Sequence, residues 1–211
     1  WMMHGDNPDK KMIFVTPHKT MGVEYGLQHG GLWLAVIPGS DTALHLALAK
    51  IIIDNGWQDQ EFIDNWVNNR WEIESGYGRG TRNTRWQWRT TWGRWQSDWE
   101  DYQKFIANEK AAELTEAAAI TGLDADLIEA AAEMIAKPRE DGSWPKTSFM
   151  LEKGNYWSNN YMNTASLAGV ALICGSGNRP GRMISRGGGH QRGGMSAGGG
   201  KGFLSPEKYP G

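Results

Sequence analysis

Residues 32–56 constrain the fold more than any other part of the sequence. An apolar run over residues 32–37 ends at a Pro-Gly pair, and a segment with helical periodicity follows it. Ser40 or Asp41 can cap this helix, and Gly56 ends it. A strand, a tight turn and a helix in succession predict an α/β fold, in which ligands bind at the carboxyl ends of the strands.

Further segments extend this pattern along the chain. We expect strands at residues 12–16 and 147–151, a short helix at 60–67, alanine-rich helices at 111–121 and 125–137, and an apolar helix at 165–173. Gly122 separates the alanine-rich helices, and Asp124 is placed to cap the second one. The glycines of GSGNRPG, which follow the apolar helix, predict a helix-terminal turn and not a dinucleotide-binding fingerprint.

The strand ends carry polar residues that could bind a ligand. Asp41 could accept two N–H bonds from a guanine, while Gly39 and Ser40 would let a sugar or phosphate approach the main chain at a helix N-terminus. A plain helix cap at Asp41 is the alternative interpretation. Thr16, His18 and Lys19 follow the first strand, where a solvated loop is the alternative interpretation.

Tryptophan and arginine alternate in the segment from about residue 70 to 99. The chain has 12 Trp among 211 residues, and six of them lie in this segment. Aromatic and arginine side chains together can bind glycans or single-stranded nucleic acid. Nearby acidic residues favour a tightly packed insertion with guanidinium–ring stacking, and a partner-subunit surface is a third interpretation.

Glycine dominates the C-terminal segment. Nine of the sixteen residues from Gly187 to Gly202 are glycine, and we predict no regular structure in the last thirty residues. Arg186 and His190 flank three glycines there, so they could project into a cavity and donate hydrogen bonds to an oxyanion. A solvated glycine loop explains the pattern equally well.

Composition narrows the possible classes. With 22 basic and 24 acidic residues the net charge is −2, which excludes a basic nucleic-acid arm. The single cysteine, Cys174, excludes an internal disulfide or a Cys-ligated cluster within this chain, and its apolar neighbours predict burial. The longest apolar run, Ala165–Gly175, is too short to span a bilayer. The chain starts at Trp1 without a leader pattern, so we expect an interior piece of a larger polypeptide.

Four motifs, in order, resemble the large, molybdenum-containing subunit of arsenite oxidase, within the dimethyl sulfoxide reductase family of molybdopterin oxidoreductases. These are VTPHK, IPGSDTALHLALAKIII, the helix pair AAELTEAAAITGLDADLIEAAAEMIA, and NTASLAGVALICGSGNRPG followed by SRGGGHQRGG. Thr-Pro-His stands where that family has Asp-Pro-Arg. The resemblance runs over essentially the whole chain.

The resemblance implies a fold and a set of site residues. Residues 1–180 would form a Rossmann-like portion that binds molybdopterin guanine dinucleotide, with a Trp/Arg-rich insertion at about 70–105, and residues 181–211 a Gly-rich active-site loop. The implied cofactor is molybdenum bis(molybdopterin guanine dinucleotide), and the ligands of the metal and of an iron–sulfur cluster would lie outside this chain. The residues implied to contact the cofactor are Thr16, His18, Lys19, Gly39, Ser40, Asp41, Lys153, Gly154 and Asn155. Arg186 and His190 would bind arsenite and stabilise developing charge.

The resemblance also implies an activity and partners. Arsenite would be oxidised to arsenate, with electrons passing through the iron–sulfur cluster to a Rieske-type small subunit, then to cytochrome c or a cupredoxin, in the periplasm. Two alternatives stay open: another molybdopterin oxidoreductase with a different oxyanion substrate, and a Trp/Arg-rich module for glycans or single-stranded nucleic acid.

Overall fold

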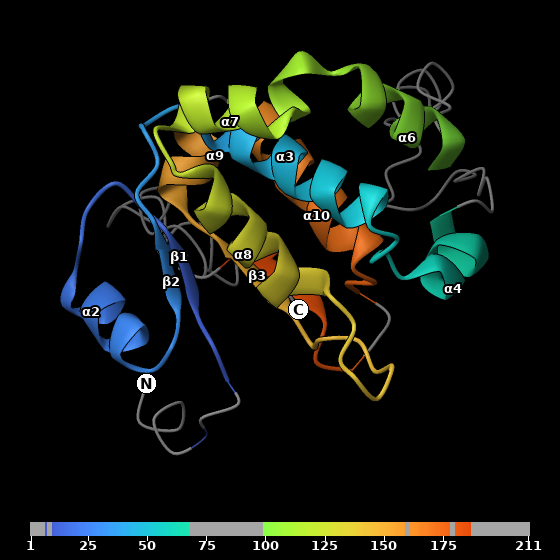
Figure 1. Cartoon of the computed structure of the whole chain (residues 1–211), viewed down its shortest axis with the longest axis horizontal. Coiled ribbons are helices and arrows are strands. Elements are labelled where there is room, and N and C mark those ends of the chain that lie inside the picture. The colour runs from blue at the N-terminus through green and yellow to red at the C-terminus, as the bar shows by residue number, and fades with distance from the viewer. Residues whose placement is uncertain (1–6, 8–9, 68–98, 159–160, 178–179, 187–211) are drawn as a thin grey trace, which may run out of the picture.

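The computed structural model describes residue 7 and residues 10–67, 99–158, 161–177 and 180–186 (Figure 1). Its strands are β1 (Ile13–Val15), β2 (Leu32–Leu34), β3 (Ser148–Leu151) and β4 (Met183–Arg186). Its helices are α2 (Met21–Gln28), α3 (Asp41–Asp54), α4 (Gln60–Phe62), α6 (Trp99–Asn108), α7 (Leu114–Thr121), α8 (Ala125–Ala136), α9 (Lys153–Ser158) and α10 (Tyr161–Ile173). A π-helix (Ile63–Val67) follows α4, and a 3-10 helix (Lys110–Ala112) precedes α7.

The strands form two parallel pairs, each closed by a helical crossover. β1 pairs with β2 through Ile13–Leu32 and Val15–Leu34, with α2 between them in sequence. β3 pairs with β4 from Ser148–Met183 to Leu151–Arg186, with α9 and α10 between them. The fold is therefore a mixture of helices and parallel strands, as the strand–turn–helix segment predicts.

The central helix is α3. It packs against α10, α8 and α7, and Figure 1 shows α3 and α10 side by side. All residues from Ala43 to Ala49 are buried, which explains why this helix is apolar or small on nearly every side. The core continues through Ile128 and Val170 on the helices around it.

The predicted helices form, but α7 begins at Leu114, after the 3-10 helix, and α10 begins at Tyr161, four residues before the predicted start. The predicted side-chain caps at Ser40 and Asp124 do not form. Ser40 and Asp124 occupy the N-cap positions of α3 and α8, and neither makes a capping hydrogen bond with its side chain. The Ser40 hydroxyl instead donates to the carbonyl of Ile37 at 2.7 Å. Gly122 ends α7 at φ 72°, the left-handed conformation that favours glycine.

Two sequence predictions about strands need correction. The predicted strand at residues 32–37 ends at Leu34, because Val36 N–H turns back to the Leu34 carbonyl. The prediction of no regular structure in the last thirty residues is wrong for residues 183–186, which form β4 along β3. Residues 187–211 and most of the Trp/Arg-rich segment (68–98) lie outside the described residues.

A buried ion pair anchors the segment that leads into β4. Arg182 Nη1 lies 2.5 Å from Asp59 Oδ2, and the two side chains are 8% and 4% exposed. Asp59 also caps α4 by accepting from Phe62 N–H, and Arg182 Nε donates to the Pro145 carbonyl. A side chain at Gly175 would collide with the Asp59 carboxylate, so the turn after α10 needs glycine there. The predicted turn in GSGNRPG is thus locked to distant parts of the chain.

Two more observations concern the parts of the chain that the structure describes. None of the helices there is long and apolar enough to cross a membrane. Cys174 is buried, as predicted, and burial raises the pKa of its thiol to about 12.

Candidate functional site

The predicted site residues at the ends of β1 and β2 lie at one edge of this strand pair. The strands are parallel and Val15 is aligned with Leu34, so the loop from Thr16 and the turn at Gly39 both leave from the carboxyl edge. Thr16 is held by its main chain: its N–H donates to the Leu34 carbonyl, and its carbonyl accepts from Trp33 Nε1 at 2.8 Å. The structure therefore brings these two predicted segments together.

The loop after Thr16 is exposed. His18 and Lys19 both face solvent, and Lys19 Nζ lies 3.9 Å from Glu24 Oε1 in the first turn of α2. At that distance and exposure the pair is a weak, solvated interaction. The Lys19 side chain therefore stays accessible to solvent at this edge.

Gly39 gives the turn its shape. Its φ is 92°, which disfavours any side chain, and a Cβ built there would have no atom within 4 Å. Ser40 next to it is buried and bonded to Ile37, so its hydroxyl supports the turn from inside. The exposed main chain at Gly39 leaves open space for a ligand to approach.

Asp41 is the first residue of α3 and is partly buried. Its Oδ2 accepts from Asn163 Nδ2 at 3.3 Å. Burial raises the pKa of Asp41 above its ordinary value, and hydrogen bonds from its own main chain and from Asn163 oppose that rise. A partly desolvated carboxylate at a helix N-terminus is well suited to accept hydrogen bonds from a polar ligand.

The predicted segment at residues 153–155 forms the first turn of α9. Lys153 and Gly154 are exposed, and a Cβ at Gly154 would meet no atom within 4 Å. Asn155 N–H donates to the Glu152 carbonyl, and the Asn155 carbonyl accepts from Asn163 Nδ2 at 3.0 Å. One amide, that of Asn163, therefore contacts both Asp41 and this segment.

Two more residues extend the hydrogen bonds around Asn163. Ser166 donates to the Asn163 carbonyl at 3.0 Å, and His45 Nδ1 lies 3.0 Å from Ser166 Oγ. Because the hydroxyl has a single hydrogen, which the Asn163 carbonyl receives, Nδ1 is the protonated nitrogen of the His45 ring. Complete burial lowers the pKa of His45 to about 4, so the ring is neutral at pH 7.

Sequence reasoning missed the residues that join the site. Asn163, Ser166 and His45 are polar side chains within otherwise apolar or small-residue helices, and all three are wholly or mostly buried. Polar residues at helical spacing in an apolar helix are a usable signal, because buried polar groups need partners. The pattern does not identify which residue each of these side chains bonds to.

The structure does not test the predicted oxyanion-binding pair. Arg186 is the last residue of β4, aligned with Leu151, so its main chain lies at the carboxyl edge of that pair. Its side chain and the whole of His190 lie outside the described residues. Their assignment stays a prediction.

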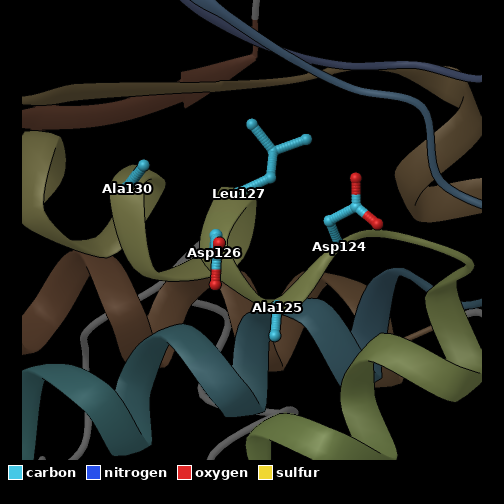
Figure 2. A pocket seen from close by; sticks show the side chains of 5 residues that line it. All are labelled: Asp124, Ala125, Asp126, Leu127 and Ala130. Atoms are coloured by element: carbon cyan, nitrogen blue, oxygen red, sulfur yellow. The ribbon is translucent and has the colours of Figure 1, made fainter.

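A separate pocket of about 570 Å³ lies at the N-terminus of α8. Figure 2 shows its lining residues, all from one stretch of the chain: Asp124, Ala125, Asp126, Leu127 and Ala130. None of them is a predicted site residue or a hydrogen-bond partner of Asn163. Among the residues with a described placement, no group of three or more His, Cys, Asp or Glu side chains could hold a metal ion.

Two curated proteins match the whole chain closely. It is 71% identical over 212 residues to iodate reductase subunit IdrA of Denitromonas iodatirespirans, and 70% identical over 211 residues to iodate reductase subunit IdrA of Pseudomonas sp. (strain SCT). Both matches cover the entire chain. It spans 23% of the length of each.

Other comparisons are more distant. Arsenite oxidase subunit AioA of Herminiimonas arsenicoxydans is 30% identical over 186 residues, which is 86% of this chain and 18% of that subunit. Among solved structures, acetylene hydratase from Pelobacter acetylenicus covers 78% of this chain and 16% of its own, with 21% identity and a TM-score of 0.45. No protein-family model matches.

The IdrA and AioA subunits support the placement among the molybdopterin oxidoreductases of the dimethyl sulfoxide reductase family. They do not support arsenite oxidase specifically, because the IdrA subunits share more than twice as much identity with the chain as AioA does.

Proposed function

We propose that this chain is part of the catalytic subunit of a molybdopterin oxidoreductase that reduces iodate. The assignment of iodate as the substrate rests on the sequence identity of 71% and 70%, over the entire chain, to two iodate reductase subunits. The arsenite oxidase subunit, at 30%, supports the broader class of oxyanion chemistry.

The residues at the carboxyl edges of the strands fit a guanine dinucleotide form of the cofactor. Gly39 and Gly154 leave open space where a side chain would otherwise stand, so a sugar or phosphate can approach the main chain. Asp41 offers the acceptor oxygens that a guanine edge needs, and Lys19 and Lys153 add positive charge near phosphates. Thr16, His18, Ser40 and Asn155 complete the set in this proposal.

The chain's own contribution is to bind and orient. When bound, the molybdenum bis(molybdopterin guanine dinucleotide) would supply two-electron oxygen-atom-transfer chemistry. Each such reduction consumes two electrons and two protons, converting iodate to iodite and water. Iodate is an anion, so Arg186 would attract it through its guanidinium and His190 would donate a hydrogen bond to an iodate oxygen.

Electron supply and location follow from the same proposal. Electrons would enter from cytochrome c or a cupredoxin through a Rieske-type small subunit and the iron–sulfur cluster, in the direction opposite to arsenite oxidation. We place the complex in the periplasm.

A direct comparison of two assays tests the substrate. The full-length subunit, purified with its small subunit, is assayed for iodate reduction with reduced viologen and for arsenite oxidation with a redox dye. We expect iodate reduction without arsenite oxidation, and loss of activity when cells are grown with tungstate in place of molybdate. Arsenite oxidation alone would reverse the substrate assignment, and inactivity in both assays would refute both substrates.

A variant pair tests the role of Arg186. Arg186→Ala should lower kcat/KM for iodate by roughly 10- to 150-fold, the loss expected for one charge-assisted hydrogen bond. Arg139→Ala, at an exposed position in the turn before β3, is the matched control. Equal activity of the two variants would remove Arg186 from the substrate site.

A further inference from the structure

Asn163 lies in the first turn of α10 and is fully buried, with 0% exposure. Its side chain makes three hydrogen bonds: Oδ1 accepts from Thr42 Oγ1 at 2.6 Å, and Nδ2 donates to Asp41 Oδ2 at 3.3 Å and to the Asn155 carbonyl at 3.0 Å. Its main-chain carbonyl accepts from Ser166. Both hydrogens of the amide are used, so this residue does more than fill space.

The partners fix the orientation of the amide. A flipped amide would turn its oxygen toward two acceptors, the Asp41 carboxylate and the Asn155 carbonyl, and its NH₂ group toward Thr42. Only the observed orientation satisfies the donors and acceptors together. Because the amide is buried, a group that lost its hydrogen bond to Asn163 could not bond to bulk water instead.

The contacts of Asn163 join segments that are remote in sequence. Asp41 and Thr42 belong to the first turn of α3, directly after the Gly39 turn, whereas Asn155 belongs to the first turn of α9. In the proposed function these are the guanine-binding turn and the segment next to the pterin. One side chain therefore sets the distance between two parts of the cofactor site.

We propose that Asn163 is a positioning residue that holds the turn at residues 39–41 and the first turn of α9 together as one preformed cofactor-binding unit. The inference rests on the proposed function, since it assigns the geometry to cofactor binding. Asn163 itself does not contact the cofactor and acts through Asp41 and Asn155.

Two substitutions of Asn163 separate positioning from general stability. Asn163→Asp keeps the size of the side chain and the oxygen that accepts from Thr42, but it loses both donated bonds and brings a second carboxylate next to Asp41. Asn163→Ala removes all three bonds. Thr121→Val is the matched control, because Thr121 is equally buried while its hydroxyl bonds within its own helix end, to Ala117, Ala118 and Leu123.

The readout is cofactor content of the full-length subunit. Molybdenum and the guanosine monophosphate released by acid hydrolysis are measured per subunit, together with the thermal midpoint. We expect both Asn163 variants to retain at least tenfold less nucleotide than wild type, and Thr121→Val to retain the wild-type amount at a similar loss in midpoint. Wild-type content in the Asn163 variants, or an equal loss in Thr121→Val, would overturn the inference.

A measurement on the wild type does not depend on the variants folding. Hydrogen exchange is compared between holoenzyme and protein from a host that cannot attach the guanine nucleotide to the pterin. We expect the amides in peptides over residues 41–45 and 153–158 to be more protected from exchange in the holoenzyme than in the protein without the nucleotide, and both peptides to change together. Greater protection in only one of the two peptides would contradict a single unit. A wild-type enzyme lacking molybdenum and nucleotide would refute the proposed function itself, which is a different outcome.

Discussion

Lowering the pH should loosen the contact between α3 and α10 through His45. The ring is completely buried and its pKa lies at about 4, below the ordinary value of 6.5. The unfolded chain therefore binds a proton more readily than the folded one between these values. Stability contributed by neutral His45 is fully present above the unfolded pKa and is lost as the pH falls toward 4.

The size of the effect follows from the shift. A shift of one pKa unit corresponds to about 1.4 kcal/mol, so the complete transition costs about 3 kcal/mol, of which roughly 2 kcal/mol is lost between pH 7 and pH 5. Asp41 acts in the opposite direction, because a carboxyl with a raised pKa makes the folded state more stable as the pH falls. Comparison with a variant that lacks only the His45 titration removes that contribution.

Hydrogen exchange of the full-length subunit provides the assay. Peptides over α3 and α10 report the free energy of local opening, after correction for the intrinsic pH dependence of exchange. We expect wild-type protection to fall about 20- to 30-fold from pH 7 to pH 5. His45→Asn should lose most of this dependence, and His18→Asn, at an exposed position, should keep it. An equal fall in His45→Asn and wild type would refute the argument.

Three further predictions concern single positions. Arg182→Ala leaves the Asp59 carboxylate buried without its cation, so we expect the free energy of unfolding, measured by thermal unfolding, to fall by about 3–5 kcal/mol. A fall below about 1 kcal/mol would contradict the buried pair. Gly39→Ala has room but a strained φ, so it should cost about 1–2 kcal/mol and lower molybdenum content. Gly142→Ala, also at positive φ with open space, should cost the same and leave molybdenum content unchanged; equal metal loss would count against Gly39. Cys174 should resist iodoacetamide at pH 8 until the protein unfolds, and peptide mapping that finds it alkylated in the native state would disprove its burial.

Local sequence patterns predicted most of the elements. The strand, turn and helix from residue 32 to 56 follow from residues within a few positions of one another, and the left-handed Gly122 and Gly56 end their helices as expected. The same local logic placed Gly39 and Asp41 at a strand end. It predicted a cap at Ser40 or Asp41 and another at Asp124. The Ser40 hydroxyl does not cap α3 because it donates to the Ile37 carbonyl, and the Asp124 side chain makes no capping bond.

Features that depend on distant pairing could not be predicted in this way. β4 is four residues long and next to glycines, and its pairing with β3 makes it a strand. The partners of Asn163 in α3 lie more than 120 positions away along the chain. The buried ion pair between Asp59 and Arg182 is equally remote in sequence. A residue type can indicate that a buried polar group needs a partner, but only the packed chain determines which one it meets.

The bond between Thr42 and Asn163 has a consequence for biosynthesis. Synthesis runs from the N-terminus, so the Gly39 turn and α3 emerge from the ribosome well before α10. More than a hundred residues are translated between Thr42 and its amide partner Asn163. A nascent chain that stops in between has the glycine turn but lacks the Asn163 bonds that join the start of α3 to α9. If the chain binds the cofactor as proposed, assembly with the nucleotide would therefore come late, after translation has passed this asparagine.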